Sequence, residues 1–494
     1  MTLLRLPTEL MESIMLSLDI QSILSCQRIC KAFRCLYQES ARLQYRVECE
    51  FAGVCDNPAC NLPVKMRLRM LRDRELAWSS LQPVFTHRAF FPPDMDVDRV
   101  DITGGHYYVG MTDPTPNTLS WVRSCPIPLE HVQAIATAGV EGQWSKIVIE
   151  GCVDFATCID EHDLIAFLTI HPTDNEDTYQ LRISLKQHST HLPYPSVKNS
   201  IFPVGDTTCD PESLLARMEI CGDVLVLAIA AEEALFFFDW RTGRMTSLVP
   251  LSGVCNMTFI RHDILCLAMP DTVTLAIYYV PSSKTSSVRL IQSFTISETF
   301  FPSGCTWIEA RGCPSPTGDG LFPTHVPTSQ PFLENPEEAI IVFDFHWRDT
   351  KSPTSMIVHR RSLLGLLPPQ NDWLACDTRV VPWSEWGPQH TRWLDSSGND
   401  ECFTTISNGQ RYVHFLSKNS PTTYTVVDFN RYRVHKALEE PRSPVNEPDE
   451  EDLQDRGKLP CIGTRSTEKV SYNMVFASDT GLVGLDVRFF FCLQ

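Results

Sequence analysis

The stretch ARMEICGDVLVLAIAAEEALFFFDWRTGRMTSLVP, residues 216–250, decides the fold of this chain. It predicts short strands, because apolar and aromatic runs alternate with turns that contain Gly, Asp and Glu. A first strand leads into a charged turn, a very apolar strand follows at 223–231, and a more amphipathic strand comes after the next turn. A unit of this size cannot bury both faces of its sheet alone, so we expect it to stack on similar units.

The same pattern recurs on both sides of this stretch. MTFIRHDILCLAMPDTVTLAIYYVPSSKTSSVRLI (257–291) follows it, and VDFATCIDEHDLIAFLTIHPTDNEDTYQLRISLKQH (153–188) precedes it. Successive units start about forty to sixty residues apart, which is typical of repeat architectures. From about residue 97 onward, the chain is a series of short strands bounded by Gly, Pro, Asp, Asn or Ser.

Radial stacking of these units predicts a mainly β chain that ends in a β-propeller of about six to eight blades. Ring closure removes the exposed sheet edges that would otherwise invite aggregation. The last segment, LDVRFFFCL (485–493), suits a blade completed by a strand from the N-terminal side. The alternative is a pair of tandem β-sandwiches, which would show frequent turns without a recurring strand pattern.

Residues 6–40, LPTELMESIMLSLDIQSILSCQRICKAFRCLYQES, predict three short amphipathic helices. We expect the first from about Thr8 to Leu18 with Thr8 as its N-cap, and the second to be capped by Asp19. Three such short helices bury too little surface to be stable alone, so apolar positions should remain outside for a partner. The apolar stripes are Leu10, Ile14 and Leu18; Ile20, Ile23 and Leu24; and Ile29, Phe33, Leu36 and Tyr37.

This segment resembles an F-box, the motif by which substrate receptors bind the Skp adaptor of SCF-type ubiquitin ligases. The resemblance rests on Leu6-Pro7 at the start, Glu9-Leu10, Ile14, Leu18 and Leu24, and the final run from Ile29 to Leu36. It implies an adaptor-binding surface that contains Leu6, Pro7, Leu10, Ile14, Leu24, Ile29, Cys30 and Phe33. The alternative is an ordinary three-helix subdomain that packs on its own chain.

The predicted domain organisation has three regions: an F-box domain at 1–45, a helical linker at 46–96, and a propeller-like substrate-binding region at 97–494. The linker contains VKMRLRMLRDRELAW (64–78), a helix that would hold the F-box at a fixed orientation. We expect a Pro-rich loop at about 311–337 and a disordered acidic loop at about 439–458. The order of motifs also resembles large fungal F-box proteins, through Ala52-Gly53 with Asp56-Asn57-Pro58, Arg74-Glu75 with Ala77-Trp78, Gly104-Gly105, and Asp239 to Gly243.

The charge balance argues against several classes of partner. The 60 acidic and 42 basic residues give a net charge of −18, which would repel nucleic acid. The longest apolar run, at 224–231, is far shorter than the roughly 20 residues of a membrane span. No secretion signal is apparent and the 19 cysteines are scattered, so we expect reduced thiols and a cytoplasmic or nuclear location, or both.

We expect no catalytic residues, no metal and no cofactor. Neither a nucleophile elbow nor a phosphate-binding or HExxH motif is present in the sequence. Cys49, Cys55 and Cys60 lack the second half of a zinc site, and the HxxH pair of His188 and His191 lacks a third ligand. The aromatic segment at 380–395, with Trp383, Trp386 and Trp393, is better explained by packing than by an interface.

These observations predict a non-catalytic substrate receptor of an SCF-type ubiquitin ligase. The F-box would bind a Skp-family adaptor and, through it, a cullin–RING ligase, while the β-region would hold an unknown target protein. The first alternative is an interaction scaffold without ubiquitylation. The second is a propeller-based enzyme, whose site could be assembled from many blades without a sequence motif.

Overall fold

The structure is a computed structural model, and its described residues lie between Leu6 and Leu493. The predicted acidic loop falls almost entirely outside them, at 440–456. The described ranges are 6–82, 86–89, 99–112, 119–127, 144–175, 177–211, 213–251, 253, 256–281, 287–297, 304–318, 322–348, 353–373, 378–395, 407–415, 423–439, 457–467, 474–478, 481–486 and 489–493.

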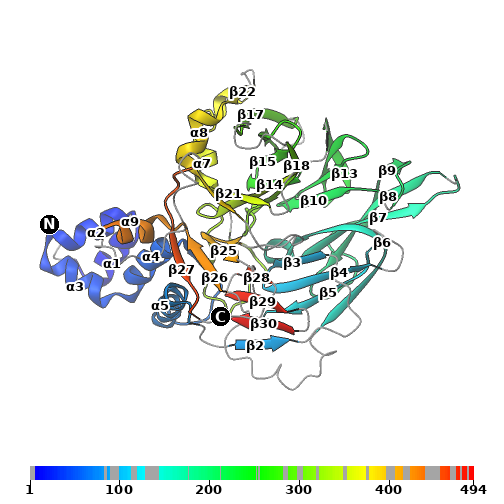
Figure 1. Ribbon diagram of the computed structural model, residues 1–494. Helices are drawn as coiled ribbons and strands as arrows, with labels where there is room; N and C mark the ends of the chain where they lie inside the picture. The colour runs from blue at the N-terminus through cyan, green and yellow to red at the C-terminus, as the bar shows by residue number, and fades with distance from the viewer. Residues whose placement is uncertain are drawn as a thin grey trace.

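Five helices form an arm at one side of a strand-rich body (Figure 1). Asp19 is confirmed as the N-cap of the second helix, because its Oδ1 accepts from the Ser22 amide at 2.8 Å. The prediction for Thr8 was wrong: Pro7 occupies the N-cap position and Thr8 is already helical, so its hydroxyl cannot cap the first turn. The five helices are α1 (Thr8–Leu16), α2 (Ile20–Ile29), α3 (Lys31–Glu39), α4 (Ala41–Ala52) and α5 (Val64–Ser80).

The long helix predicted at 64–78 is confirmed as α5, and α4 is an additional helix between it and α3. Ile29 ends α2 instead of belonging to the third helix, since Cys30 is extended at φ −156° and separates the two.

The strands form antiparallel units of four that follow one another along the chain. Units 1 and 2 share one long strand and together make a seven-stranded sheet. Unit 1 is β3 (Arg99–Thr103), β4 (His106–Thr112), β5 (Leu119–Pro126) and the first half of β6 (Ser145–Cys158). Unit 2 is the second half of β6 with β7 (Leu164–Pro172), β8 (Tyr179–Gln187) and β9 (Ile201–Thr207).

Units 3 to 5 follow unit 2 along the chain, each with its own antiparallel sheet. Unit 3 is β10 (Ala216–Cys221), β11 (Val224–Ile229), β12 (Ala234–Asp239) and β13 (Arg244–Pro250). Unit 4 is β14 (Asn256–Arg261), β15 (Ile264–Met269), β16 (Thr274–Tyr279) and β17 (Arg289–Thr295), extended by the parallel strand β22 (Arg379–Val381). Unit 5 is β18 (Cys305–Arg311), β20 (Ile340–Trp347), β21 (Thr354–His359) and β23 (Thr391–Asp395).

Units 6 and 7 complete the body. Unit 6 is β24 (Ser407–Asn408), β25 (Arg411–Phe415), β26 (Tyr424–Asp428) and β27 (Ile462–Arg465). Unit 7 is β28 (Met474–Ala477), β29 (Leu482–Asp486), β30 (Phe489–Leu493) and β2 (Thr86–Ala89). The last segment of the predicted β-region, 485–493, contains the end of β29 and the whole of β30, and these two strands pair with each other antiparallel.

Apolar clusters join each unit to the next and close the ring. Separate clusters link unit 1 to 2, unit 2 to 3, unit 3 to 4, and unit 4 to 5. One further cluster contains side chains of units 5, 6, 7 and 1 together. The C-terminal β30 also pairs with the N-terminal β2, as expected for a completed blade. The fold is therefore a β-propeller of seven units within the described residues, and the tandem-sandwich alternative was wrong.

Helices also occur inside the β-region, where the sequence predicted almost none. They are α6 (Ile159–His162), α7 (Arg360–Gly365), α8 (Trp383–His390) and α9 (Arg431–Glu439), with a 3₁₀ turn at Gln370–Asp372. The packing prediction for Trp383, Trp386 and Trp393 is confirmed, because all three are buried in the cluster between units 4 and 5.

Gly151 lets β6 pass from unit 1 into unit 2. Ser145 to Val148 pair with β5 and Asp154 to Cys158 pair with β7, whereas Cys152 pairs with both strands at an irregular point of the register. Its φ of +63° is strained for any residue with a Cβ, and an added Cβ would lie 2.3 Å from the Ile170 carbonyl oxygen.

We predict that Gly151→Ala lowers the melting temperature clearly more than Gly105→Ala. Gly105 is the matched control, since its φ is +67° and an added Cβ meets nothing within 4 Å. The control should cost only the left-handed backbone penalty of about 1–2 kcal/mol. Thermal unfolding of both purified variants tests this, and equal losses would contradict the crowding at Ile170.

Candidate functional site

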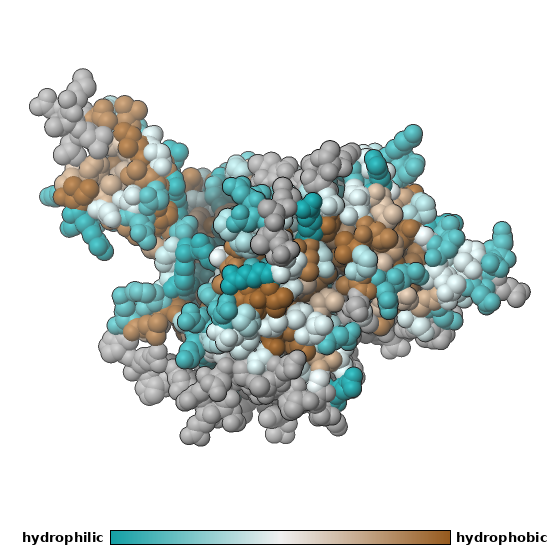
Figure 2. Space-filling view, turned by 90° about the horizontal axis from the view of Figure 1, so that it is seen from above, coloured by the Kyte–Doolittle hydropathy of each residue, from teal (hydrophilic) through white to brown (hydrophobic). Residues whose placement is uncertain are grey.

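The outer surface of the helical arm keeps apolar side chains in solvent. Leu10 is 51% exposed, Ile14 40% and Ile29 70%, although α1 and α2 bury Met15 and Ile23. Figure 2 shows the arm as a projection with apolar surface on it. Exposed large apolar side chains on short helices are typical of a surface that a partner covers.

The residues predicted for adaptor contact do not all lie on this surface. Pro7 is also exposed, whereas Leu6, Leu24 and Cys30 are half-buried. Phe33 is 8% exposed and packs into the arm's own core, so its observed contacts are internal. The sequence could not separate these cases, because a stripe on a helix does not say which neighbour it faces. Contact of these residues with an adaptor stays a prediction.

A buried group of charges joins the arm to the ring. Glu75 of α5 accepts from Nη2 of Arg411, the first residue of β25, at 2.9 and 3.1 Å. Arg433 of α9 also donates to Glu75. The indole of Trp78, one turn further along α5, lies 4.9 Å from the Arg411 guanidinium carbon, which is a cation–π distance.

The rest of this group, which we call the charged joint, balances its charge. Glu334 of β19 (Phe332–Glu334) receives both Arg74 of α5 and Arg411. Asp428 lies 3.2 Å from Arg433 and 3.7 Å from Arg411. The joint thus contains three guanidinium groups and three carboxylates, and the side chains of Arg411 and Glu334 are only 4% and 3% exposed. Burial of so many charges is tolerable only when each has a partner.

Electrostatics favour the charged form of Glu75. Burial by itself would raise its pKa, but Arg411, Arg74 and Arg433 outweigh burial and hold the pKa below its usual 4.5. A lowered pKa stabilises the folded state above the ordinary pKa, and this stabilisation is lost as the pH falls through the lowered value.

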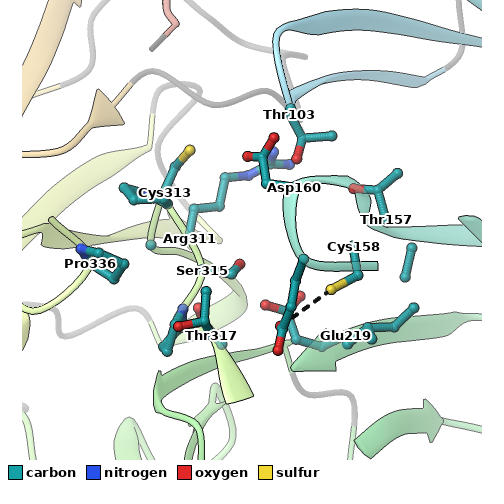
Figure 3. Close-up of a pocket in the computed structure, with 18 of the residues that line it drawn as sticks. Thr103, Thr157, Cys158, Asp160, Glu219, Arg311, Cys313, Ser315, Thr317 and Pro336 are labelled. Atoms are coloured by element: carbon teal, nitrogen blue, oxygen red, sulfur yellow. Dashed lines mark hydrogen bonds between the residues drawn. The ribbon is translucent and has the colours of Figure 1, made fainter. Parts of the chain in front are cut away.

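The inner strands of the ring surround a cavity of about 860 Å³. Its lining comes from β3, β6, β10, β14 and β18, the first or inner strands of units 1 to 5, together with the segment that follows β18. Figure 3 shows Thr103, Cys158, Glu219 and Arg311 converging on this space from different strands. The volume is that of an ordinary small-ligand pocket.

The Pro-rich segment at 311–337 closes one end of the cavity. Arg360, 1% exposed, donates to the carbonyls of Gly312 at 3.0 Å, Pro314 at 2.9 Å and Pro336 at 2.5 Å. The segment ends in β19, which pairs with β1 (Val54–Asp56) of the arm. This end of the cavity therefore faces the helical arm.

The opposite end lies where β10 begins. Leu215 lines the cavity there and is 52% exposed, whereas Cys221 at the other end of the strand donates to the Pro316 carbonyl within the Pro-rich segment.

Comparison with protein families finds one match, to the F-box domain, over residues 3–36. The arm carries an F-box domain. F-box domains generally serve as adaptor-binding parts of SCF-type ligases, and the F-box here begins the arm that the charged joint attaches to the propeller. Comparison with curated proteins finds no match for this chain.

Solved structures resemble the chain only distantly. The WD40 domain of SCAP from fission yeast has 10% identity over 81% of this chain and 84% of that chain, with a TM-score of 0.37. AztD from Citrobacter koseri has 10% identity over 78% and 79%, with a TM-score of 0.36. The β-propeller domain of the Trilobed protease from Pyrococcus furiosus has 9% identity over 70% and 90%, with a TM-score of 0.26. The propeller assignment behind the F-box therefore rests on the closed ring of sheets described above.

One group of possible metal ligands, Cys158, Glu161 and His162, was missed from the sequence. Their ligand atoms lie within 4.8 Å of one another, and CxxEH across the β6–β7 turn is the signal that could have found them. The Glu161 carboxylate already accepts hydrogen bonds from the Gly318 amide at 2.8 Å and the Gly222 amide at 3.3 Å. It also accepts one from the Cys158 thiol at 3.6 Å, which is the dashed line in Figure 3. These bonds tie the turn to unit 3 and to the Pro-rich segment. Among the described residues, neither Cys49, Cys55 and Cys60 nor His188 and His191 form such a group.

We predict that Glu75→Gln destabilises the attachment of the F-box arm by about 3–5 kcal/mol, because it leaves the three guanidinium groups of the buried joint with only two carboxylates. Asp73→Asn on the same helix is the matched control, since Asp73 is 59% exposed and its ion-pair partner Arg69 is exposed too. It should change stability by less than about 0.5 kcal/mol. Urea unfolding followed by tryptophan fluorescence measures both, and equal effects would contradict the role of the joint.

Proposed function

We propose that this chain is the substrate-recognition subunit of an SCF-type ubiquitin ligase. The F-box binds a Skp-family adaptor through the exposed apolar residues of α1 and α2, and the propeller holds a target protein. The observation that carries the proposal is an F-box with uncovered apolar side chains, attached by a buried charged joint to a closed ring. Such an attachment holds a bound target at a set place relative to the ligase.

In this proposal the chain itself is not catalytic. The adaptor brings the cullin–RING ligase, whose ubiquitin-carrying partner performs the transfer, and this chain contributes proximity by raising the effective concentration of target lysines. The reaction then needs no nucleophile from the receptor.

We also propose that the protein works in the cytoplasm, the nucleus or both. The described cysteines form no disulfide bonds with one another, which fits a reducing compartment. No described helix is both long and apolar enough to cross a membrane.

We predict that the double change Leu10→Asp and Ile29→Asp abolishes adaptor binding. Each removes a largely exposed apolar side chain whose burial stabilises a complex by about 1.5–3 kcal/mol, so affinity should fall at least about 100-fold. Leu76→Asp is the matched control, because Leu76 is 67% exposed on α5, outside the F-box. Gel filtration of each variant with purified Skp-family adaptor measures the complex. No complex with the unchanged chain at micromolar concentration would overturn the proposal.

A second measurement distinguishes the proposed ligase receptor from the alternative, an interaction scaffold without ubiquitylation. The unchanged chain with its adaptor should co-elute with the cullin–RING ligase and support ubiquitylation of a captured target. Adaptor binding without cullin recruitment would favour the scaffold instead.

A further inference from the structure

The inner strands give the central cavity a surplus of carboxylates. Eight carboxylates and three guanidinium groups line the cavity. By contrast, the contacts between neighbouring units of the ring are apolar. The carboxylates belong to Asp101, Asp154, Asp160, Glu161, Glu219, Glu309, Glu334 and Glu337, and the guanidinium groups to Arg217, Arg261 and Arg311.

Two of the guanidinium groups are held by carboxylates of their own strand or turn. Arg311 donates to Glu309 at 2.9 Å, and Arg261 makes two bonds to Asp263, at 2.5 and 3.0 Å. The guanidinium groups of Arg311 and Arg261 therefore already have carboxylate partners within the protein and are poorly placed to bind an anion.

Several of the carboxylates that line the cavity also have hydrogen-bond or ion-pair partners within the protein. Asp154 accepts from the Met218 amide at 2.9 Å, Glu161 accepts from two backbone amides, and Glu334 belongs to the charged joint. These groups hold strands and turns together, so they are structural acceptors.

Glu219 differs from them. It lies in the middle of β10, where Met218 and Ile220 on either side point into the apolar core and Glu219 faces the cavity. Its carboxylate accepts no hydrogen bond and forms no ion pair within the described residues. Glu219 is half-buried, with part of its surface accessible in the cavity, and a partly buried carboxylate without a partner is costly, so a ligand that supplies a partner would reduce that cost.

The charges around Glu219 come from several elements. Burial is the largest influence and raises its pKa to about 8. Asp101 of β3 and Asp154 of β6 raise the pKa further, whereas Arg360 of α7 and Arg311 of β18 lower it. The group is therefore mostly protonated at neutral pH, and a bound cation would favour its charged form.

We propose that the central cavity binds a guanidinium or ammonium group of a ligand, with Glu219 as the carboxylate that receives it. The source is either a basic side chain of a target protein, which rests on the proposed function, or a free small amine, which does not. The cavity is large enough for either. The end near Leu215, away from the F-box arm, is the entrance.

The proposal is tested by calorimetry on the full chain with two probes, the peptide acetyl-Gly-Arg-Gly-amide and free agmatine. Acetyl-Gly-citrulline-Gly-amide is the control ligand, because citrulline has the shape of arginine without its charge. We expect the charged probes to bind and the citrulline peptide to bind at least tenfold more weakly. Tighter binding of the arginine peptide points to a protein side chain, and tighter binding of agmatine points to a small amine.

The variant Glu219→Gln should lose binding of the charged probes at least tenfold with an unchanged melting temperature, since glutamine resembles the protonated carboxyl already present. Asp174→Asn, an exposed carboxylate outside the cavity lining, is the matched control and should bind normally.

The pH dependence of the unchanged chain provides a readout that needs no variant. Because proton and cation compete for Glu219, affinity for the arginine peptide should fall about tenfold per pH unit below pH 8 and level off above it. Affinity independent of pH, equal binding of the citrulline peptide, equal binding by Glu219→Gln, or no binding of either charged probe at millimolar concentration would each overturn the proposal. Adaptor binding measured on the same samples separates this failure from failure of the proposed function.

Discussion

The ion pair between Glu75 and Arg411 lies at the centre of the buried charged joint between the two halves of this protein. It connects the last helix of the arm with an inner part of unit 6, and it is completed by Arg433, Arg74, Glu334 and Asp428. Three positive and three negative groups cancel, so a charged contact can be buried at the joint without an unpaired ion. A purely apolar contact would bury as much surface but would specify direction less sharply. The F-box surface is therefore presented at a set angle to the ring.

Closure of the ring imposes the second constraint. Seven units meet through apolar clusters on their faces, which leaves only the inner strands to line the centre. Polar residues of those strands can remain there because they face a cavity instead of a packed sheet. Arg360 seals the end that faces the arm by holding the Pro-rich segment through three carbonyls. The central cavity and the F-box surface are thus separate parts of the molecule, connected through the Pro-rich segment and the charged joint.

Local signals in the sequence predicted most elements correctly and failed where the environment was decisive. Asp19 caps its helix because a capping bond involves residues three apart, whereas Thr8 does not because the chain enters α1 one residue earlier. Helix α8 forms over a segment with Gly387 and Pro388, since packing of Trp383 and Trp386 outweighs poor helix propensity. The segment at 485–493 has strand propensity, but only the pairing of β30 with β29 and with β2 shows that it contains parts of two strands.

The sequence by itself determined the F-box, the repeated strand pattern and the mainly β class, because these depend on residue types at short spacing. The tertiary structure decided which F-box residues are outside: Ile29 is exposed and Phe33 is buried, although both lie on predicted apolar stripes. It also decided that Glu219, one polar residue in an ordinary strand pattern, faces the central cavity and has no partner among the described residues. Ring closure decides which side chains from distant strands come close to a given residue. No local sequence pattern contains that information.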